Sequence, residues 1–191
     1  MTYAIDFVAV DEGRTAEVRD WRTLLAVEPA DRFFAFGQPI LAPADGRVVS
    51  VHDGEPDHEA RRSQSALAQY ALTQASRARR GPGALAGNHV VLALGRDGPY
   101  AVLAHLRRGS IGVRPGDAVA VGQELGACGN SGNSTQPHVH VQVMDAPDPM
   151  TARGLPIAFR DYRAWRRWGA QPRVVRQGIP EEREIVESLA G

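Results

Sequence analysis

Apolar and polar residues alternate along residues 139–144, VHVQVM, directly after a turn rich in Gly, Asn and Ser. This period of two predicts a β-strand with at least one covered face. His138 and His140 then face the same way, with Cα atoms roughly 6.6 Å apart at ~3.3 Å of rise per residue. A Zn–N bond is only about 2.0–2.1 Å long. One imidazole can therefore bind a metal ion while the other contacts a metal-bound water or the substrate.

The same alternation occurs at residues 3–10, YAIDFVAV. It predicts a strand on which Asp6 stands among apolar neighbours. A buried carboxylate has to be paired, hydrogen-bonded or bound to a metal ion. Taken alone, Asp6 favours a paired structural acid over a metal ligand.

Short strands joined by turns fill most of the middle of the chain. Residues 36–51, with the turn PADG, predict one hairpin, and residues 87–94 and 100–106 predict a second hairpin around a Gly-Pro break. Residues 113–129 carry short apolar pairs punctuated by glycines, which is typical of a barrel-like or sandwich core. We therefore expect a mainly β protein with an antiparallel β-sheet core of short strands.

Two stretches show helical patterns. Residues 59–86 carry apolar residues at roughly helical spacing among polar and basic ones, which predicts an inserted surface helix or loop. Pro180 and the two glutamates after it mark a helix start, and the apolar residues that follow form a stripe, so we expect a C-terminal helix. The predicted organisation is a β core domain at residues 1–160 and a C-terminal segment with a helix at residues 161–191.

An aromatic and basic cluster occupies residues 163–176, where five arginines accompany Trp165 and Trp168. A cluster of this kind can contact polysaccharide or a nucleic-acid backbone. We favour instead an ordinary docking segment, with the two indole rings packed on the core.

Composition narrows the classes of function. The 191 residues, 43% of them hydrophobic, are enough for one well-buried core. The 22 Lys and Arg residues balance the 22 Asp and Glu residues, so we expect neither nucleic acid nor an anionic membrane as a partner. No apolar run approaches the ~18 residues of a membrane span, and residues 1–10 lack the basic start of a signal peptide. Cys128 is the single cysteine, and its place beside a turn favours a structural role over a reactive thiol.

Five segments occur together in the order and spacing of one known family: APADGRVVSV, GNHVVLAL, YAVLAHL, VRPGDAVAVGQELGACGNSG and PHVHVQV. They resemble the lysostaphin-like or LytM-like zinc endopeptidases, peptidase family M twenty-three. The resemblance spans roughly residues 3–145, and its G-x-S-G-x-S-x-x-P-H-x-H segment is far more specific than a lone H-x-H. It implies a β-sheet core of the duplicated hybrid motif, barrel-sandwich-like.

The resemblance also implies a Zn²⁺ cofactor and roles for four residues. Asp6, in YAIDF, and His140, the second histidine of H-x-H, match zinc ligands of the family. His105, in AHL, and His138 match its two catalytic histidines, which handle the water and the developing oxyanion. A zinc ion bound in this way polarises a peptide carbonyl and lowers the pKa of its water toward ~7.

The remaining zinc ligand of the family has no visible counterpart. In the family a first histidine lies a few residues before the aspartate, and Thr2 stands where an H-x-x-x-D motif would need it. A catalytic zinc normally has three protein ligands and one open position. Three explanations stay open: a start downstream of the true one, which we rank first, a substitute histidine, or a loss of hydrolysis. Of the other histidines, His52 and His58 fit surface positions and His89 an edge or core position.

The leading prediction is a zinc-dependent endopeptidase that hydrolyses peptide bonds of bacterial peptidoglycan. The alternative is a degenerate, non-catalytic relative that binds cell-wall peptide or regulates another hydrolase. Zinc content and hydrolysis separate the two. The resemblance implies an extracellular or cell-envelope location, although no export signal is visible in the sequence.

Overall fold

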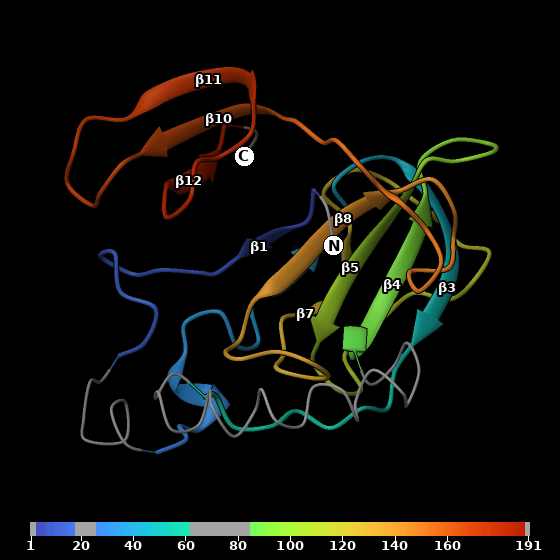
Figure 1. Ribbon diagram of the computed structural model, residues 1–191, viewed down its shortest axis with the longest axis horizontal. Helices are drawn as coiled ribbons and strands as arrows, with labels where there is room; N and C mark the ends of the chain where they lie inside the picture. Colours follow the sequence, from blue (N-terminus) through green and yellow to red (C-terminus); the bar gives the residue numbers. More distant parts are fainter. Residues whose placement is uncertain (1–2, 18–25, 62–84, 190–191) are drawn as a thin grey trace.

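Antiparallel strands form nearly all of the regular structure in the described part of the chain, which confirms the mainly β class. The computed structural model describes residues 3–17, 26–61 and 85–189 (Figure 1). A short 3-10 helix, η1 (Ala30–Arg32), lies in the second of these ranges. The strands are β1 (Ile5–Phe7), β2 (Pro39–Leu41), β3 (Gly46–His52), β4 (Asn88–Ala93), β5 (Tyr100–Leu106), β6 (Ala118–Val119), β7 (Glu124–Ala127), β8 (Val139–Met144), β9 (Gly154–Leu155), β10 (Phe159–Trp165), β11 (Arg173–Gly178) and β12 (Ile185–Ser188).

The largest sheet has seven strands in the order β1-β8-β5-β4-β3-β6, with β9 paired to β8 beyond the end of β1. Figure 1 shows β3, β4, β5 and β8 side by side, with β1 next to β8. The antiparallel β4–β5 pairing confirms the hairpin predicted for residues 87–94 and 100–106. The strand order brings β1, from the start of the chain, beside the H-x-H strand β8.

The main hydrophobic core joins this sheet to the two-stranded sheet β2-β7. Ile40 of β2 and Leu125 of β7 pack against residues from the large sheet, namely Val48, Val90, Leu92, Leu103 and Leu106. A smaller cluster on a separate set of side chains contains Val91, Val102, Ala104 and Met144. Since Val91 alternates with Val90 and Leu92 along β4, this cluster lies on the opposite face of the sheet. That face also carries His105 and His140, which line a cleft together with Val102 and Ala104.

The predicted hairpin at residues 36–51 is wrong. Strand β2 pairs with β7, while β3 pairs with β4 and β6, so the turn at residues 43–46 leads from one sheet to another. The reason is packing: Ile40 and Val48 both enter the main core from opposite layers. A turn between two apolar runs cannot reveal whether the runs pair or face each other.

The predicted C-terminal helix is also wrong, because Ile185–Ser188 is a strand, β12, paired with β10. The helix-start signals produce a single turn, closed by a hydrogen bond from Glu184 N to Glu181 O of 3.0 Å. Arg183 then adopts a φ of 65°, outside the right-handed helical region. Arg173 of β11 donates two hydrogen bonds of 2.8 and 3.0 Å from Nη2 to the Glu184 carboxylate, whose side chain is only 2% exposed. Tertiary pairing therefore overrides the local helical preference.

Trp168 differs from the expectation of an indole ring packed on the core. Trp168 is 60% exposed, so its indole is not buried. Strands β11-β10-β12 form a separate three-stranded sheet, seen apart from the large sheet in Figure 1. Phe159 of this sheet meets Phe7 of β1 edge to face, with ring centroids 5.3 Å apart. The division into domains at residues 1–160 and 161–191 stays a prediction.

Most of the insertion predicted at residues 59–86, namely residues 62–84, lies outside the described residues. In the described part of the chain, no helix has the length and apolar character needed to cross a bilayer.

Leu125→Ala tests the main core. The Leu125 side chain has no exposed surface, so its truncation should leave a cavity and lower the free energy of unfolding by about 2–5 kcal/mol. Urea denaturation measures the change. The matched control is Val121→Ala, at a position that is 64% exposed. This variant should change the free energy of unfolding by less than about 0.5 kcal/mol. Similar losses in both variants would contradict the packing described.

Cys128 should be chemically inert in the folded protein. Burial raises the pKa of its thiol to about 12, and the negative charge of Asp57 adds to the effect. The thiolate is the reactive form, and the residue is 2% exposed. We expect no reaction with dithionitrobenzoate near pH ~8 in the native state and full reaction in concentrated guanidinium chloride. Rapid native labelling would contradict a structural role.

Candidate metal and catalytic site

Pairing between β1 and β8 places Asp6 directly opposite His140. The two side chains point to the same face of the sheet because directly paired residues share a face. Asp6 Oδ1 lies 2.8 Å from His140 Nδ1. Two donors of the kind that bind zinc, a carboxylate and an imidazole, thus meet across neighbouring strands.

His138 precedes β8 and is held by the turn before it. Its Nδ1 lies 2.7 Å from Gln136 O and 3.0 Å from Ser134 Oγ. Ser134 Oγ itself donates to Gln136 O at 2.7 Å. Since a carbonyl only accepts, Nδ1 carries the proton, and Nε2 is the ring nitrogen left for the site. His138 Nε2 lies 3.7 Å from Asp6 Oδ2.

His105 reaches the same face through a bulge in β5. Asn88 pairs with Leu106 and Val90 with Leu103, so His89 alone stands opposite both Ala104 and His105. His105 has a φ of 64°, a left-handed conformation uncommon for a residue other than glycine. Strict alternation would turn His105 toward the main core beside Leu103. The bulge turns it instead to the face of Ala104, as bulges beside functional sites often do.

Ser131 holds the His105 ring in place. His105 Nδ1 donates to Ser131 O at 2.9 Å. Ser131 Oγ donates to Leu106 O at 2.8 Å and accepts from Asn88 N at 3.0 Å, which ties the turn to β4 and β5. The His105 ring centroid lies 4.7 Å from that of His138 and 6.0 Å from that of His140.

The structure therefore brings together all four residues singled out in the sequence. Asp6, His105, His138 and His140 line one cleft of about 320 Å³. Its remaining lining comes from Leu85, Ala86, Val102, Ala104, Asn133, Thr135, Gln142 and Pro149. Sequence reasoning did not select Ser131, Ser134 or Gln136, whose signal was only the Gly, Asn and Ser content of the turn.

The electrostatics of the cleft favour a neutral His105. Burial is the main cause that lowers the pKa of His105 to about 3, and the charge of His138 lowers it further, while the hydrogen bond that His105 donates to Ser131 O opposes the shift. For Asp6, desolvation raises the pKa, but the hydrogen bond with His140 and the charges of the three histidines outweigh it, so the pKa falls below its usual value. Near neutral pH the cleft pairs an ionised carboxylate with a neutral, buried imidazole.

The donor set fits zinc in part. Asp6 and His140 supply oxygen and nitrogen, the ligand atoms that zinc takes from carboxylates and imidazoles. Across residues 3–17, 26–61 and 85–189, no group of three or more His, Cys, Asp or Glu side chains is arranged to hold a metal ion. A third protein ligand is therefore missing from the described part of the site.

The other histidines lie outside the cleft. His52 and His89 pair across β3 and β4, with stacked rings 5.5 Å apart. His89 is buried, and its Nδ1 donates to Gly87 O at 2.8 Å, as expected for a hydrogen-bonded core position. His58 contacts Gly132 O through Nε2 at 2.9 Å and Arg61 through Nδ1 at 3.2 Å, so it fixes the turn and is more than a surface residue.

An antiparallel β scaffold with a carboxylate and three histidines in one cleft defines a metallopeptidase-like class of protein. The family model described as Peptidase family M23 matches residues 30–152, more than half of the chain. The chain belongs to this family. The matched span contains His105, His138 and His140, whereas Asp6 lies before it and is placed in the cleft by the pairing of β1 with β8.

Solved structures of the family share low sequence identity with the chain. A mutant of the catalytic domain of the prophage-encoded protein EnpA from Enterococcus faecalis is 22% identical, with a TM-score of 0.42, and the match covers 82% of this chain and 90% of that one. The catalytic domain of lysostaphin from Staphylococcus simulans is 21% identical, with a TM-score of 0.40, over 67% and 84%. A zinc-containing peptidase from Vibrio cholerae is 21% identical, with a TM-score of 0.39, over 62% of this chain and 26% of that one. The chain thus spans about a quarter of the last protein. No curated protein matches it in sequence.

We expect the 191-residue chain to hold zinc weakly, because two protein ligands leave the ion largely solvated. Elemental analysis after dialysis should find clearly less than one zinc per chain, and His140→Ala should lower that content further. His52→Ala, at a position outside the cleft, is the matched control and should leave the zinc content unchanged. One tightly held zinc per chain, lost on substitution of His52 or His89, would overturn the assignment.

Proposed function

We propose that the chain is a zinc-dependent endopeptidase that hydrolyses peptide bonds of bacterial peptidoglycan. The observation that carries the proposal is the convergence of Asp6, His105, His138 and His140 in one cleft, from three separate strands and a turn. Membership of a peptidase family supports hydrolysis of a peptide bond as the reaction. The resemblance to lysostaphin-like and LytM-like enzymes supports peptidoglycan as the substrate and a location outside the cytoplasm.

Asp6 and His140 are the residues that would hold the zinc ion. When bound, zinc supplies a Lewis acid for the peptide carbonyl and lowers the pKa of a bound water toward ~7. The carboxylate is already ionised, since the pKa of Asp6 is lowered. Its side chain is 58% exposed, so this end of the cleft is open to solvent.

His105 and His138 would supply the proton transfer and the hydrogen bond to the oxyanion. Both rings are tied at Nδ1 to backbone carbonyls, of Ser131 and Gln136, which leaves both Nε2 atoms for substrate. A neutral Nε2 accepts a proton, and the protonated ring can return it to the leaving amine. General acid–base help typically contributes about 10²- to 10⁴-fold, and an oxyanion donor about 10²- to 10³-fold.

A second function is favoured by one observation: the described residues provide no third metal ligand. A relative without retained zinc would bind cell-wall peptide in the same cleft, or regulate another hydrolase, without cleaving. The cleft of about 320 Å³ is large enough for a short peptide segment rather than a folded partner. Zinc-dependent hydrolysis decides between this function and the peptidase.

Histidine substitutions test the proposed roles in the zinc-loaded chain. His140→Ala should lose zinc and activity together, because it removes a ligand. His105→Ala and His138→Ala should keep the zinc and lower turnover roughly 10²-fold or more, because each removes a group that acts mainly in the transition state. The assay is release of soluble peptides from purified peptidoglycan, with zinc measured on the same samples.

His52→Ala is the control for these variants, since it removes an imidazole outside the cleft and should leave turnover unchanged. If His105→Ala cleaves as fast as the parent, its catalytic role is wrong. If the zinc-loaded parent cleaves nothing, the peptide-binding function replaces the peptidase.

A further inference from the structure

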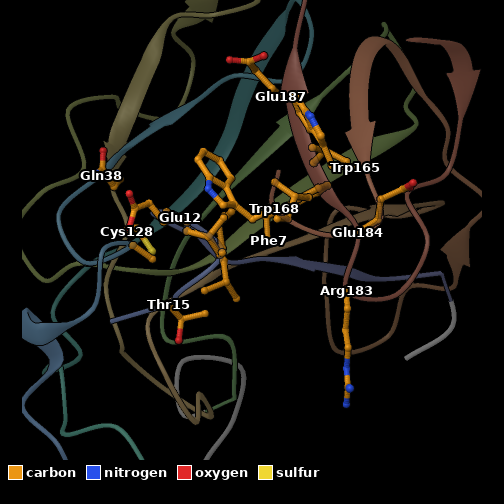
Figure 2. A pocket seen from close by; sticks show the side chains of 18 of the residues that line it. Phe7, Glu12, Thr15, Gln38, Cys128, Trp165, Trp168, Arg183, Glu184 and Glu187 are labelled. Atoms are coloured by element: carbon orange, nitrogen blue, oxygen red, sulfur yellow. The ribbon is translucent and has the colours of Figure 1, made fainter. Parts of the chain in front are cut away.

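A second, larger hollow lies between the start of the chain and the C-terminal sheet (Figure 2). Its volume is about 1140 Å³, against about 320 Å³ for the cleft with the histidines. Phe7 of β1 and Val139 of β8 line it, together with residues 184–187 of the C-terminal sheet and the tryptophans Trp165 and Trp168. The proposed peptidase chemistry uses none of these side chains.

Trp168 is the notable side chain in this groove. It is 60% exposed although an indole is largely apolar, so it remains available to a ligand. Its Cβ lies against Gly13: a Cβ added at Gly13 would come within 3.1 Å of it. Figure 2 shows the indole among the lining residues, between Glu12 and Glu187. The ring is thus anchored at its base while its tip stands in the groove.

The charges of the groove disfavour a polyanion as its ligand. The ionisable lining residues are two arginines and three glutamates: Arg167, Arg183, Glu12, Glu184 and Glu187. Glu184 is paired with Arg173, and Glu187 lies 3.2 Å from Arg163. Nucleic-acid binding depends on neutralising phosphates with an excess of Lys and Arg. A mixed rim around an apolar, aromatic floor instead fits a neutral ligand with hydroxyl and amide groups.

We propose that this groove binds the glycan strand of peptidoglycan, a neutral polymer of N-acetylated amino sugars. Sugar rings have apolar C–H faces that stack on an indole, and hydroxyl and amide groups that bond to a polar rim such as Glu12 and Glu187. The volume exceeds the usual ~300–1,000 Å³ of a small-molecule pocket, so it accommodates more than one sugar. Peptidoglycan as the source of the glycan rests on the proposed function.

The position of the groove relative to the cleft supports this ligand. Phe7 and Val139 line the groove, while their neighbours in the same two strands, Asp6 and His140, line the cleft. The two sites therefore lie on opposite faces of β1 and β8. Because β1 is the last strand in the sheet order, a peptide attached to the glycan can pass around its edge.

Calorimetric titration tests the groove without relying on catalysis. The metal-free full chain is titrated with a hexamer of β-1,4-linked N-acetylglucosamine and with soluble glycan strands stripped of peptide. We expect both to bind, and Trp168→Ala to weaken binding by roughly tenfold or more because stacking on the ring is lost. Trp168→Phe should recover part of the affinity. Val174→Ala, at a 56% exposed position on β11 outside the groove, is the control and should bind like the parent.

Absence of glycan binding by the parent, or equal binding by Trp168→Ala, would overturn the proposal. Competition by oligodeoxythymidine or by an apolar peptide would also overturn it, since the groove would then serve another class of ligand. Circular dichroism and thermal melting of each variant verify that it is folded. Cleavage of a soluble peptide by the zinc-loaded chain without glycan binding refutes this inference alone, whereas glycan binding without any cleavage refutes the proposed function alone.

Discussion

The register between β1 and β8 is the constraint on which the candidate site depends. Asp6 stands opposite His140, and the hydrogen bond of 2.8 Å between Oδ1 and Nδ1 follows from that pairing. Side chains alternate between faces along a strand, so a slip of one residue would send Asp6 into the groove and Phe7 into the cleft. Phe7 resists such a slip because it is packed edge to face on Phe159 of β10. The C-terminal sheet thus helps to set the register that pairs Asp6 with His140.

A second constraint fixes the two remaining histidines through the turn at residues 129–138. Backbone carbonyls of Ser131 and Gln136 accept from the Nδ1 atoms of His105 and His138. Ser131 is itself bonded to β4 and β5 through Asn88 N and Leu106 O. Asn88 in turn accepts from Gly54 N and Glu55 N and donates to Glu55 O and Leu106 O. The Nδ1 tautomer and the direction of the His105 ring are therefore set by the Asn88–Ser131 network, and those of the His138 ring by Gln136 O and Ser134.

Local alternation was sufficient to predict part of this arrangement. It placed His138 and His140 on one face and Asp6 on a strand, and the resemblance added that these residues share one site; the pairing of β1 with β8 came only from the structure. The face of His105 could not be read from β5, because alternation along residues 100–106 turns that residue toward the main core. A bulge in β5 turns His105 to the opposite face. The bulge depends on contacts with Asn88 and Ser131 that no local pattern contains. The strand β12 was missed for a similar reason, since its pairing with β10 and the Arg173–Glu184 contact are tertiary.

The cleft has a buried end, at His105 and His138, and a solvent-exposed end, at Asp6. His105 and His138 are 6% and 8% exposed, whereas the Asp6 side chain is 58% exposed. Burial first, and then the neighbouring His138, lowers the pKa of His105 to about 3, so the inner end of the cleft holds a neutral His105 ring. The outer end lies at Asp6 on β1, and it is the side from which a substrate or a further metal ligand can approach. The same edge strand, β1, lies between the cleft and the groove that contains Trp168, so the proposed ligand, a polymer with peptide side chains, would reach both sites around one edge of the sheet.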